Sequence, residues 1–313
     1  MNHPFPLLLK LGAVVVAGTA ALLSFRRQYG FTALHLLRRN ILHTLLNLPG
    51  GVDGATVPPT ILVLGFRGHG KSAFVNTICR VLVGEEGPMI LRSETAPVGF
   101  PPTASAQLAV RVAAIVGCDC GEWVGEMEEE GEGLVVEFID APPLPEPAVL
   151  TSALVEAALD SFAVGGGRSV APECVVVVLK CSRWVRERHL AIRRLTEIAS
   201  VVRNRGLNPL IVLTHKKSLR NCKQEELKQK VAFRARTDCV YFIENYTTKC
   251  STKCRAPTVV KNNFDTHYTT LAIIRQCIEF VAQHRRQSSR KRVNLATHVN
   301  EKNKDERIDF NKS

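Results

Sequence analysis

The feature that most constrains this 313-residue chain is a glycine loop placed between an apolar run and a helical segment. The loop GFRGHGKS spans residues 65–72 and satisfies the pattern G-x4-G-K-[ST] in full. It follows the apolar run Ile61–Leu64 and opens a helical pattern, which is the context that a phosphate-binding loop needs. Glycines let successive backbone N–H groups point into one concavity, and the dipole of the following helix adds positive potential there. The loop therefore predicts a site for a polyphosphate chain.

Individual side chains of the loop predict roles at such a site. Lys71 is expected to reach the terminal phosphates and to act in catalysis, and the Ser72 hydroxyl is expected to bind Mg²⁺. Arg67 is a second catalytic candidate, although it could also crowd an attacking water or simply face solvent. The candidate phosphate-binding residues are Gly65, Arg67, Gly68, His69, Gly70, Lys71, Ser72 and Ala73.

Further metal candidates lie beyond the loop. The run VVEFI at residues 135–139 ends in Asp140, and proteins with such a loop use a carboxylate at a strand end to hold Mg²⁺ directly or through water. Thr95 and Thr103 lie between the two motifs in a proline-rich segment. Either could complete the metal shell, and Thr103 is the preferred candidate.

Strand-like and helix-like segments alternate through the middle of the chain. This order predicts an α/β fold with three layers, a mainly parallel sheet and helices on both faces. The segments expected to form strands are 61–65, 106–116, 134–139, 175–179, 210–213 and 240–243. The segments expected to form helices are 71–83, 184–205, 218–234 and 266–284.

The amino-terminal region differs in composition from the rest. Residues 1–52 contain no Asp or Glu, and the run Phe5–Phe25 is largely apolar. As a helix this run would extend about 32 Å, close to the ~30 Å hydrocarbon core of a bilayer. Arg26 and Arg27 follow directly, which favours a single amino-terminal membrane span with the main domain in the cytosol. An organelle-targeting segment, a cleaved secretory signal and a helix packed on the domain remain alternatives.

The net charge and the cysteine content exclude few functional classes. The net charge of +12 favours anionic neighbours, but no nucleic-acid-binding motif accompanies it, so nucleic acid is an unlikely partner. The ten cysteines show no paired zinc-ribbon spacing and are expected to be reduced.

We divide the chain into a hydrophobic anchor or targeting segment, an amphipathic helix with a linker, a phosphate-loop domain and a basic tail expected to be disordered. These four regions are 1–30, 31–57, 58–284 and 285–313.

Four motifs together resemble, in order and spacing, the GTPase-like domain of the interferon-induced protein 44 family, and more distantly dynamin- and septin-type GTPases. They are the loop at 65–72, the turn DAP at 140–142, IVLTHKK at 211–217 and FIENYT at 242–247. The resemblance covers residues 58–284 and implies a P-loop GTPase-like fold that binds GTP or GDP with Mg²⁺. It also implies that Thr214, His215 and Asn245 line the base pocket. Several relatives dimerise, so a homodimer is among the partners that the resemblance suggests.

The sequence departs from the pattern of those relatives at the positions that read the base and support hydrolysis. Lys217 stands where an Asp accepts hydrogen bonds from guanine, so ATP is not excluded. Pro143 stands where a glycine amide contacts the terminal phosphate, and proline has no N–H to donate. Leu144 follows, where many GTPases place a water-orienting Gln. These changes predict nucleotide binding with slow or absent hydrolysis. The competing hypothesis is a non-catalytic scaffold that keeps the fold without nucleotide turnover.

Overall fold

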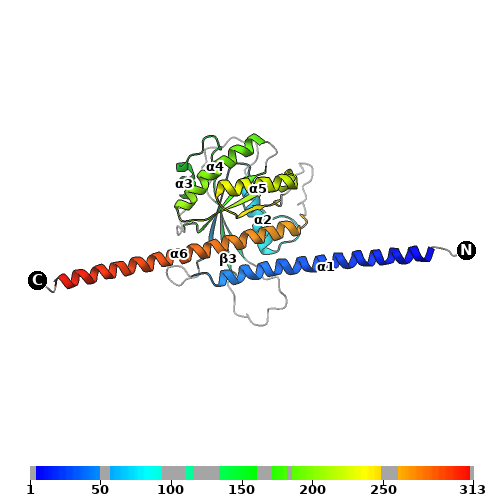
Figure 1. Cartoon of the computed structure of the whole chain (residues 1–313), viewed down its shortest axis with the longest axis horizontal. Coiled ribbons are helices and arrows are strands. Elements are labelled where there is room, and N and C mark those ends of the chain that lie inside the picture. Colours follow the sequence, from blue (N-terminus) through cyan, green and yellow to red (C-terminus); the bar gives the residue numbers. More distant parts are fainter. Residues whose placement is uncertain are drawn as a thin grey trace.

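The computed structural model describes residues 5–49, 57–93, 110–115, 134–160, 171–181, 185–247 and 260–310. A six-stranded sheet lies between two layers of helices in this part of the chain (Figure 1). The predicted α/β class is thus confirmed. The predictions for Thr95 and Thr103 fall outside the described residues.

The sheet has the strand order β2-β3-β1-β4-β5-β6. Every neighbouring pair is parallel except β2 and β3, which are antiparallel. The central strands β1 and β4 are almost fully buried, and this is why their sequences are nearly continuous apolar runs rather than alternating ones. The strands are β1 Thr60–Gly65, β2 Val110–Ile115, β3 Val135–Asp140, β4 Cys174–Lys180, β5 Pro209–Thr214 and β6 Val240–Phe242.

Helices cover both faces of the sheet. α2 and α6 lie on one face with α1 beside them, whereas α3, α4 and α5 cover the other (Figure 1). The helices are α1 Phe5–Leu46, α2 Lys71–Val83, α3 Ser152–Asp160, α4 Val185–Asn204, α5 Asn221–Ala235 and α6 Phe264–Phe310, and a 3₁₀ turn spans Lys216–Ser218. The sequence patterns predict α2, α4 and α5 at close to their observed bounds and only the first part of α6, and they do not reveal α3.

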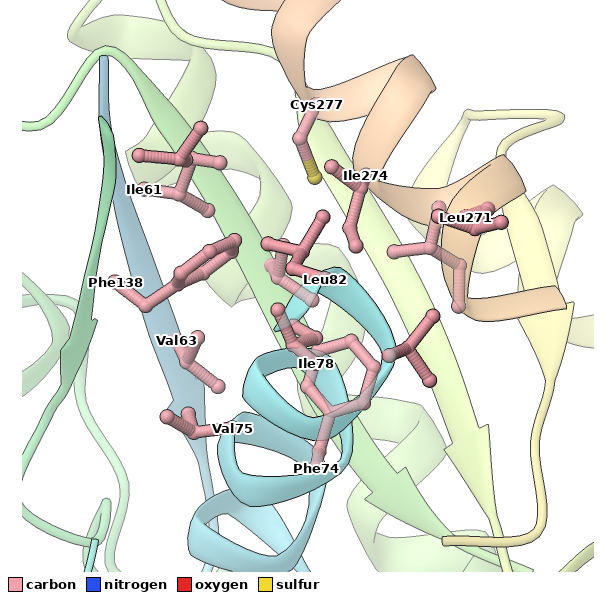
Figure 2. Close-up of a cluster of buried hydrophobic side chains, with 14 of the residues drawn as sticks. Ile61, Val63, Phe74, Val75, Ile78, Leu82, Phe138, Leu271, Ile274 and Cys277 are labelled. Carbon is pink, nitrogen blue, oxygen red and sulfur yellow. The ribbon is translucent and has the colours of Figure 1, made fainter. Parts of the chain in front are cut away.

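Each face of the sheet has its own apolar core, because alternate residues of a strand point to opposite sides. Ile61 and Val63 of β1 pack in the core with α2 and α6, while Leu62 and Leu64 pack against α3, α4 and α5. Figure 2 shows the first core, where side chains from α2 fill the space between the sheet and α6. This packing fixes the start of α2 relative to the end of β1, which is where the glycine loop lies.

The two ends of the chain form long helices that run side by side near the domain and extend in opposite directions (Figure 1). α1 is one helix from Phe5 to Leu46, with no break at residue 30, and it enters the core through Leu37, Ile41 and Leu45. α6 continues to Phe310, whereas we expected a disordered tail from residue 285. The charged sequence of this tail hides its helical continuation, because a polar pattern alone does not distinguish a solvated helix from a disordered segment.

The expected membrane span lies within α1. Among the residues searched, all of them in the described part of the chain, no helix combines the length and the apolar character that a bilayer crossing requires.

Candidate functional site

The glycine loop connects β1 to α2 with a backbone that its glycines make possible. A Cβ at Gly65 would lie 2.4 Å from the carbonyl oxygen of Val178 on the neighbouring strand, so only glycine fits there. Gly68 and Gly70 have φ values of 73° and 86°, in the left-handed region that favours glycine. The first bond of α2 runs from the Phe74 N–H to the Gly70 carbonyl at 2.9 Å. The amides of residues 71–73 thus begin the helix at the loop, where backbone donors lack partners within the helix.

Lys71 is the most unusual residue of the loop. Its side chain is only 8% exposed, yet it makes no hydrogen bond or ion pair with the described residues. Burial lowers the pKa of Lys71 below its usual range, and the nearby Asp140 carboxylate opposes this shift. A cation in a largely buried position directly after the loop amides suits the binding of an anion.

Asp140 lies at the end of β3 beside β1, as predicted, and is only 6% exposed. Its Oδ2 accepts a hydrogen bond of 2.6 Å from the Ser93 hydroxyl, whereas the buried Oδ1 has no partner within the described residues. Asn76 of α2 holds Ser93 in place, since its amide donates to the Ser93 carbonyl and its oxygen accepts the Ser93 N–H, both at 2.8 Å. Sequence reasoning missed Ser93 and Asn76.

Thr214 and Asn245 contact the loop itself. The Thr214 hydroxyl donates to the carbonyl of His69 at 2.8 Å, and the Asn245 amide donates to the carbonyl of Gly70 at 3.1 Å. Thr214 is the last residue of β5, and Asn245 follows β6. These bonds hold the loop in its curled shape. The Asn245 Oδ1 is buried without a partner within the described residues.

The two histidines near the loop have different environments. The His69 ring is buried, packs edge-on against Phe66 and accepts the Lys180 N–H at Nδ1 over 3.3 Å. Burial, followed by the charges of Lys71, Lys180 and His215, lowers the pKa of His69 to about 4. The His69 ring is therefore neutral and supports the loop. His215 is exposed, has a left-handed backbone (φ 58°) and places Nδ1 3.0 Å from the Thr214 hydroxyl.

The positions expected to support hydrolysis lie close to the loop but carry no suitable group. The N–H of Leu144 donates to the carbonyl of Gly65 at 3.0 Å, while the Leu144 side chain is buried in the core beside Phe66. Pro143 precedes it and is half-buried. Arg67 lies exposed on the loop. Nothing at the Leu144 position can orient an attacking water.

The predicted site residues thus come together at one edge of the sheet, where β1, β3, β5 and β6 end. Thr214 and Asn245 bond to the backbone of the loop there, and the charge of Asp140 acts on Lys71. Ser72 and Ala73 are half-buried in the first turn of α2. Carboxyl ends of parallel strands are where α/β proteins bind their ligands. Within the described residues, no group of three or more His, Cys, Asp or Glu side chains could hold a metal ion.

The strand order, the antiparallel edge strand β2 and the glycine loop between β1 and α2 define the class of the protein. It is a three-layer α/β protein with a P-loop, GTPase-like fold. No known family profile matches the chain, and no curated protein matches it either. The resemblance to the interferon-induced protein 44 family is not confirmed at this finer level.

Several solved structures are similar in outline. The signal recognition particle receptor SRb–GTP/SRX complex from Chaetomium thermophilum is 14% identical with a TM-score of 0.35, over 61% of this chain and 90% of that chain. A GTP-binding protein from the hyperthermophilic archaeon Sulfolobus solfataricus in complex with GDP is 13% identical with a TM-score of 0.36, over 72% and 52%. An SsGBP and GDP complex is 13% identical with a TM-score of 0.38, over 75% and 53%.

The chain spans between 52% and 67% of the length of the SsGBP and Sulfolobus proteins that it matches. At identities this low the likeness concerns the general fold. What those proteins bind is therefore not carried over to this chain by the likeness.

Proposed function

We propose that this protein binds a guanine nucleotide with Mg²⁺ through its glycine loop and hydrolyses it slowly or not at all. The observation that carries the proposal is the largely buried Lys71, which opens α2 directly after the glycine loop. A terminal phosphate would accept hydrogen bonds from the Lys71 ammonium and neutralise its charge. The loop amides and the start of α2 would bind the remaining phosphate oxygens.

The residues near Lys71 also fit a magnesium ion. Mg²⁺ prefers oxygen ligands and usually keeps several waters, so that one or two protein side chains with a phosphate suffice. The unpartnered Oδ1 of Asp140 and the Ser72 hydroxyl are the oxygen donors expected to hold it, directly or through water. When bound, the ion would neutralise charge on the phosphates. Thr103 stays a further candidate ligand.

We expect slow hydrolysis because of the residues that surround the loop. Lys71 and the loop amides would stabilise charge on a transferred phosphoryl group, with Arg67 as a second cation. Pro143 offers no N–H to the terminal phosphate, and the Leu144 side chain is buried. Without a group that orients water, binding should persist better than hydrolysis. A scaffold that binds no nucleotide is the alternative, and the experiment below separates the two.

Membrane attachment through the amino-terminal segment is a separate part of the proposal, supported by the acid-free residues 1–52 and the arginine pair at 26–27. By the distribution of these arginines the domain would face the cytosol. Organelle targeting and a cytoplasmic location remain the alternatives. A homodimer stays an expectation from the resemblance.

Lys71→Met tests the nucleotide site. Met removes the charge but keeps most of the length of the side chain, so the affinity for GDP in Mg²⁺, measured by calorimetry, should fall about 10- to 100-fold. Urea unfolding of the same variant checks its stability, because the substitution also removes the cation whose charge acts on the buried Asp140 carboxylate. Lost binding in a variant that is still folded cannot be explained by misfolding.

Lys228→Met, on α5 and away from the loop, is the matched control and should bind GDP like the wild type. If the wild-type protein binds neither GDP nor GTP at sub-millimolar concentration, the nucleotide-binding proposal is wrong and the scaffold alternative stands. If ADP and ATP bind more tightly than GDP and GTP, the guanine preference is wrong while the phosphate site remains.

A further inference from the structure

We propose that Glu244 supplies the carboxylate that recognises the guanine base, in place of the Asp that the neighbouring turn lacks at Lys217. This inference rests on the proposed nucleotide site and concerns its specificity. The supporting observation is a contact between the turn after β5 and the segment after β6, which the sequence pattern does not predict.

The two segments are held together by three successive hydrogen bonds. The Ile243 N–H donates to the Leu213 carbonyl at 2.9 Å, and the Lys216 N–H donates to the Ile243 carbonyl at 3.3 Å. The third bond joins the Lys217 N–H to the Glu244 Oε2 at 2.9 Å. The Glu244 carboxylate is therefore fixed at residue 217 of the turn, where the expected Asp is absent.

The backbone around Glu244 is also well anchored. Ile243 is buried in the core on one side of it, and the Thr266 hydroxyl donates to the Glu244 carbonyl at 3.2 Å. On the other side Asn245 donates to the carbonyl of Gly70 in the glycine loop. Glu244 is thus one residue away from direct contact with the proposed phosphate site. A base attached to those phosphates would lie beside the segments that follow β5 and β6.

The chemistry of the carboxylate suits guanine and disfavours adenine. Guanine presents two neighbouring donors, the N1–H and the exocyclic N2–H₂, to which a carboxylate can accept hydrogen bonds. Adenine presents an unprotonated N1 at the same place, whose lone pair a carboxylate repels. Oε2 of Glu244 accepts from Lys217, while Oε1 accepts no hydrogen bond within the described residues. A carboxylate has about four acceptor sites, so several remain for a base.

Lys217 does not compete for this role. Its side chain is exposed, and it contributes its backbone N–H rather than its ammonium group to the contact with Glu244. The bond orients the carboxylate, which reduces the conformational freedom that Glu244 would lose on binding a base. The longer Glu side chain, which follows β6, would then accept hydrogen bonds from guanine. In the GTPases that the sequence resembles, a shorter Asp on the turn has this role.

Glu244→Gln in the full-length protein tests the inference. Gln can keep the bond to the Lys217 N–H through its carbonyl oxygen, which turns its NH₂ group toward the base edge. Calorimetry in Mg²⁺ would give the affinities for GDP, IDP and ADP. IDP lacks the exocyclic N2 amino group but is otherwise the same ligand. The preferences of the wild type for GDP over IDP and over ADP should each fall about tenfold in the variant.

Inorganic tripolyphosphate serves as the probe that carries no base. Its affinity should be the same in Glu244→Gln and wild type, because Glu244 contacts no phosphate in this arrangement. Glu225→Gln, an exposed site on α5, removes the same charge and should leave every ratio unchanged. Lys217→Asp added to Glu244→Gln returns a carboxylate to the turn and should restore the preference for GDP over ADP.

The outcomes separate the two proposals. If the wild type binds none of these ligands, the nucleotide site itself is wrong, and the role of Glu244 falls with it. If GDP binds but its preference over IDP and ADP is the same in Glu244→Gln, Glu244 only holds the turn and this inference alone is wrong. A loss of tripolyphosphate binding in the variant would likewise overturn it, since the substitution would then act on the loop rather than on the base.

Discussion

At the scale of single residues, two buried histidines link the stability of the protein to pH. Burial is the main cause for both, and nearby positive charges add to it, so that the pKa values of His69 and His267 fall from 6.5 to about 4. His267 packs edge-on against Tyr246, and its buried Nε2 has no partner within the described residues. Both rings are therefore neutral in the folded protein at neutral pH.

The depressed pKa values predict that the protein loses stability as the pH falls from about 6.5 toward 4. In this window the unfolded chain takes up protons that the folded chain does not, so protonation favours unfolding. Above 6.5 both states are neutral and the contribution is fully present. Each histidine adds up to about 1.4 kcal/mol per pH unit within the window. Urea unfolding at a series of pH values between 7 and about 5 would measure the slope.

His267→Phe isolates one of the two histidines. Phe keeps an aromatic ring against Tyr246 but cannot take up a proton, so the variant should show a shallower fall of stability with pH. The histidine makes no side-chain hydrogen bond to the described residues that Phe would lose. Parallel stability curves for wild type and variant would show that His267 does not titrate in this window.

The sequence predicts the site residues that belong to a local motif. It does not predict the site residues whose role depends on a contact with a distant part of the chain. Lys71 and Asp140 are predictable because a loop pattern and a strand end fix their positions. Ser93 contacts Asp140 across 47 residues, and Glu244 contacts Lys217 across 27. Neither pairing leaves a spacing signature, since the fold alone brings these segments together.

At the scale of elements, the glycine loop offers a test of how tightly its backbone is constrained. Gly65 pairs with Val178 on β4, and an added Cβ would lie 2.4 Å from the Val178 carbonyl oxygen. Gly65→Ala must therefore push β1 and β4 apart and should destabilise the protein by about 2 kcal/mol or more. Thermal unfolding with and without GDP would show both the lost stability and the lost binding.

Gly68→Ala is the matched variant in the same loop. An added Cβ at Gly68 meets nothing within 4 Å, so the only cost is the left-handed backbone with φ 73°. That cost is about 1 kcal/mol for an L-residue. Equal losses for the two variants would mean that the contact with Val178 does not constrain the loop.

The strands and helices differ in how far the sequence predicts them. The run VVVV in β4 is β-branched and apolar throughout, and it predicts a buried strand that the structure confirms. α3 was missed because its nine residues bury only Val155 and Leu159, too few for a clear helical period. The antiparallel pairing of β2 with β3 is consistent with their order in the sequence, because strands that succeed one another directly can form a hairpin.

At the scale of the whole molecule, Arg285 joins parts of the chain that lie far apart in sequence. The sequence predicts that Arg285 begins a disordered tail, because the apolar periodicity of the preceding helix stops there. The structure instead places it in α6, paired with Glu173 just before β4, 112 residues away. Their side chains are only 10% and 13% exposed. The guanidinium also donates to the carbonyls of Pro49 and Val57, on either side of the link from α1 to the domain.

Arg285→Met should therefore destabilise the protein by about 3 kcal/mol, because it leaves the Glu173 carboxylate buried without its cation. The same change at the neighbouring Arg286, which is exposed, should cost almost nothing. Adding Glu173→Gln to Arg285→Met removes the stranded charge and should recover part of the loss, although the bonds to Pro49 and Val57 stay broken.

Hydrogen exchange would show which elements lose stability in Arg285→Met. Because Arg285 holds the chain just after α1, its removal should raise exchange in the last turns of α1, around Ile41 and Leu45, more than in α4 on the opposite face of the sheet. Uniformly faster exchange would mean that the pair stabilises the domain as a unit. Faster exchange confined to α1 would mean that Arg285 acts as the joint between the amino-terminal helix and the phosphate-loop domain.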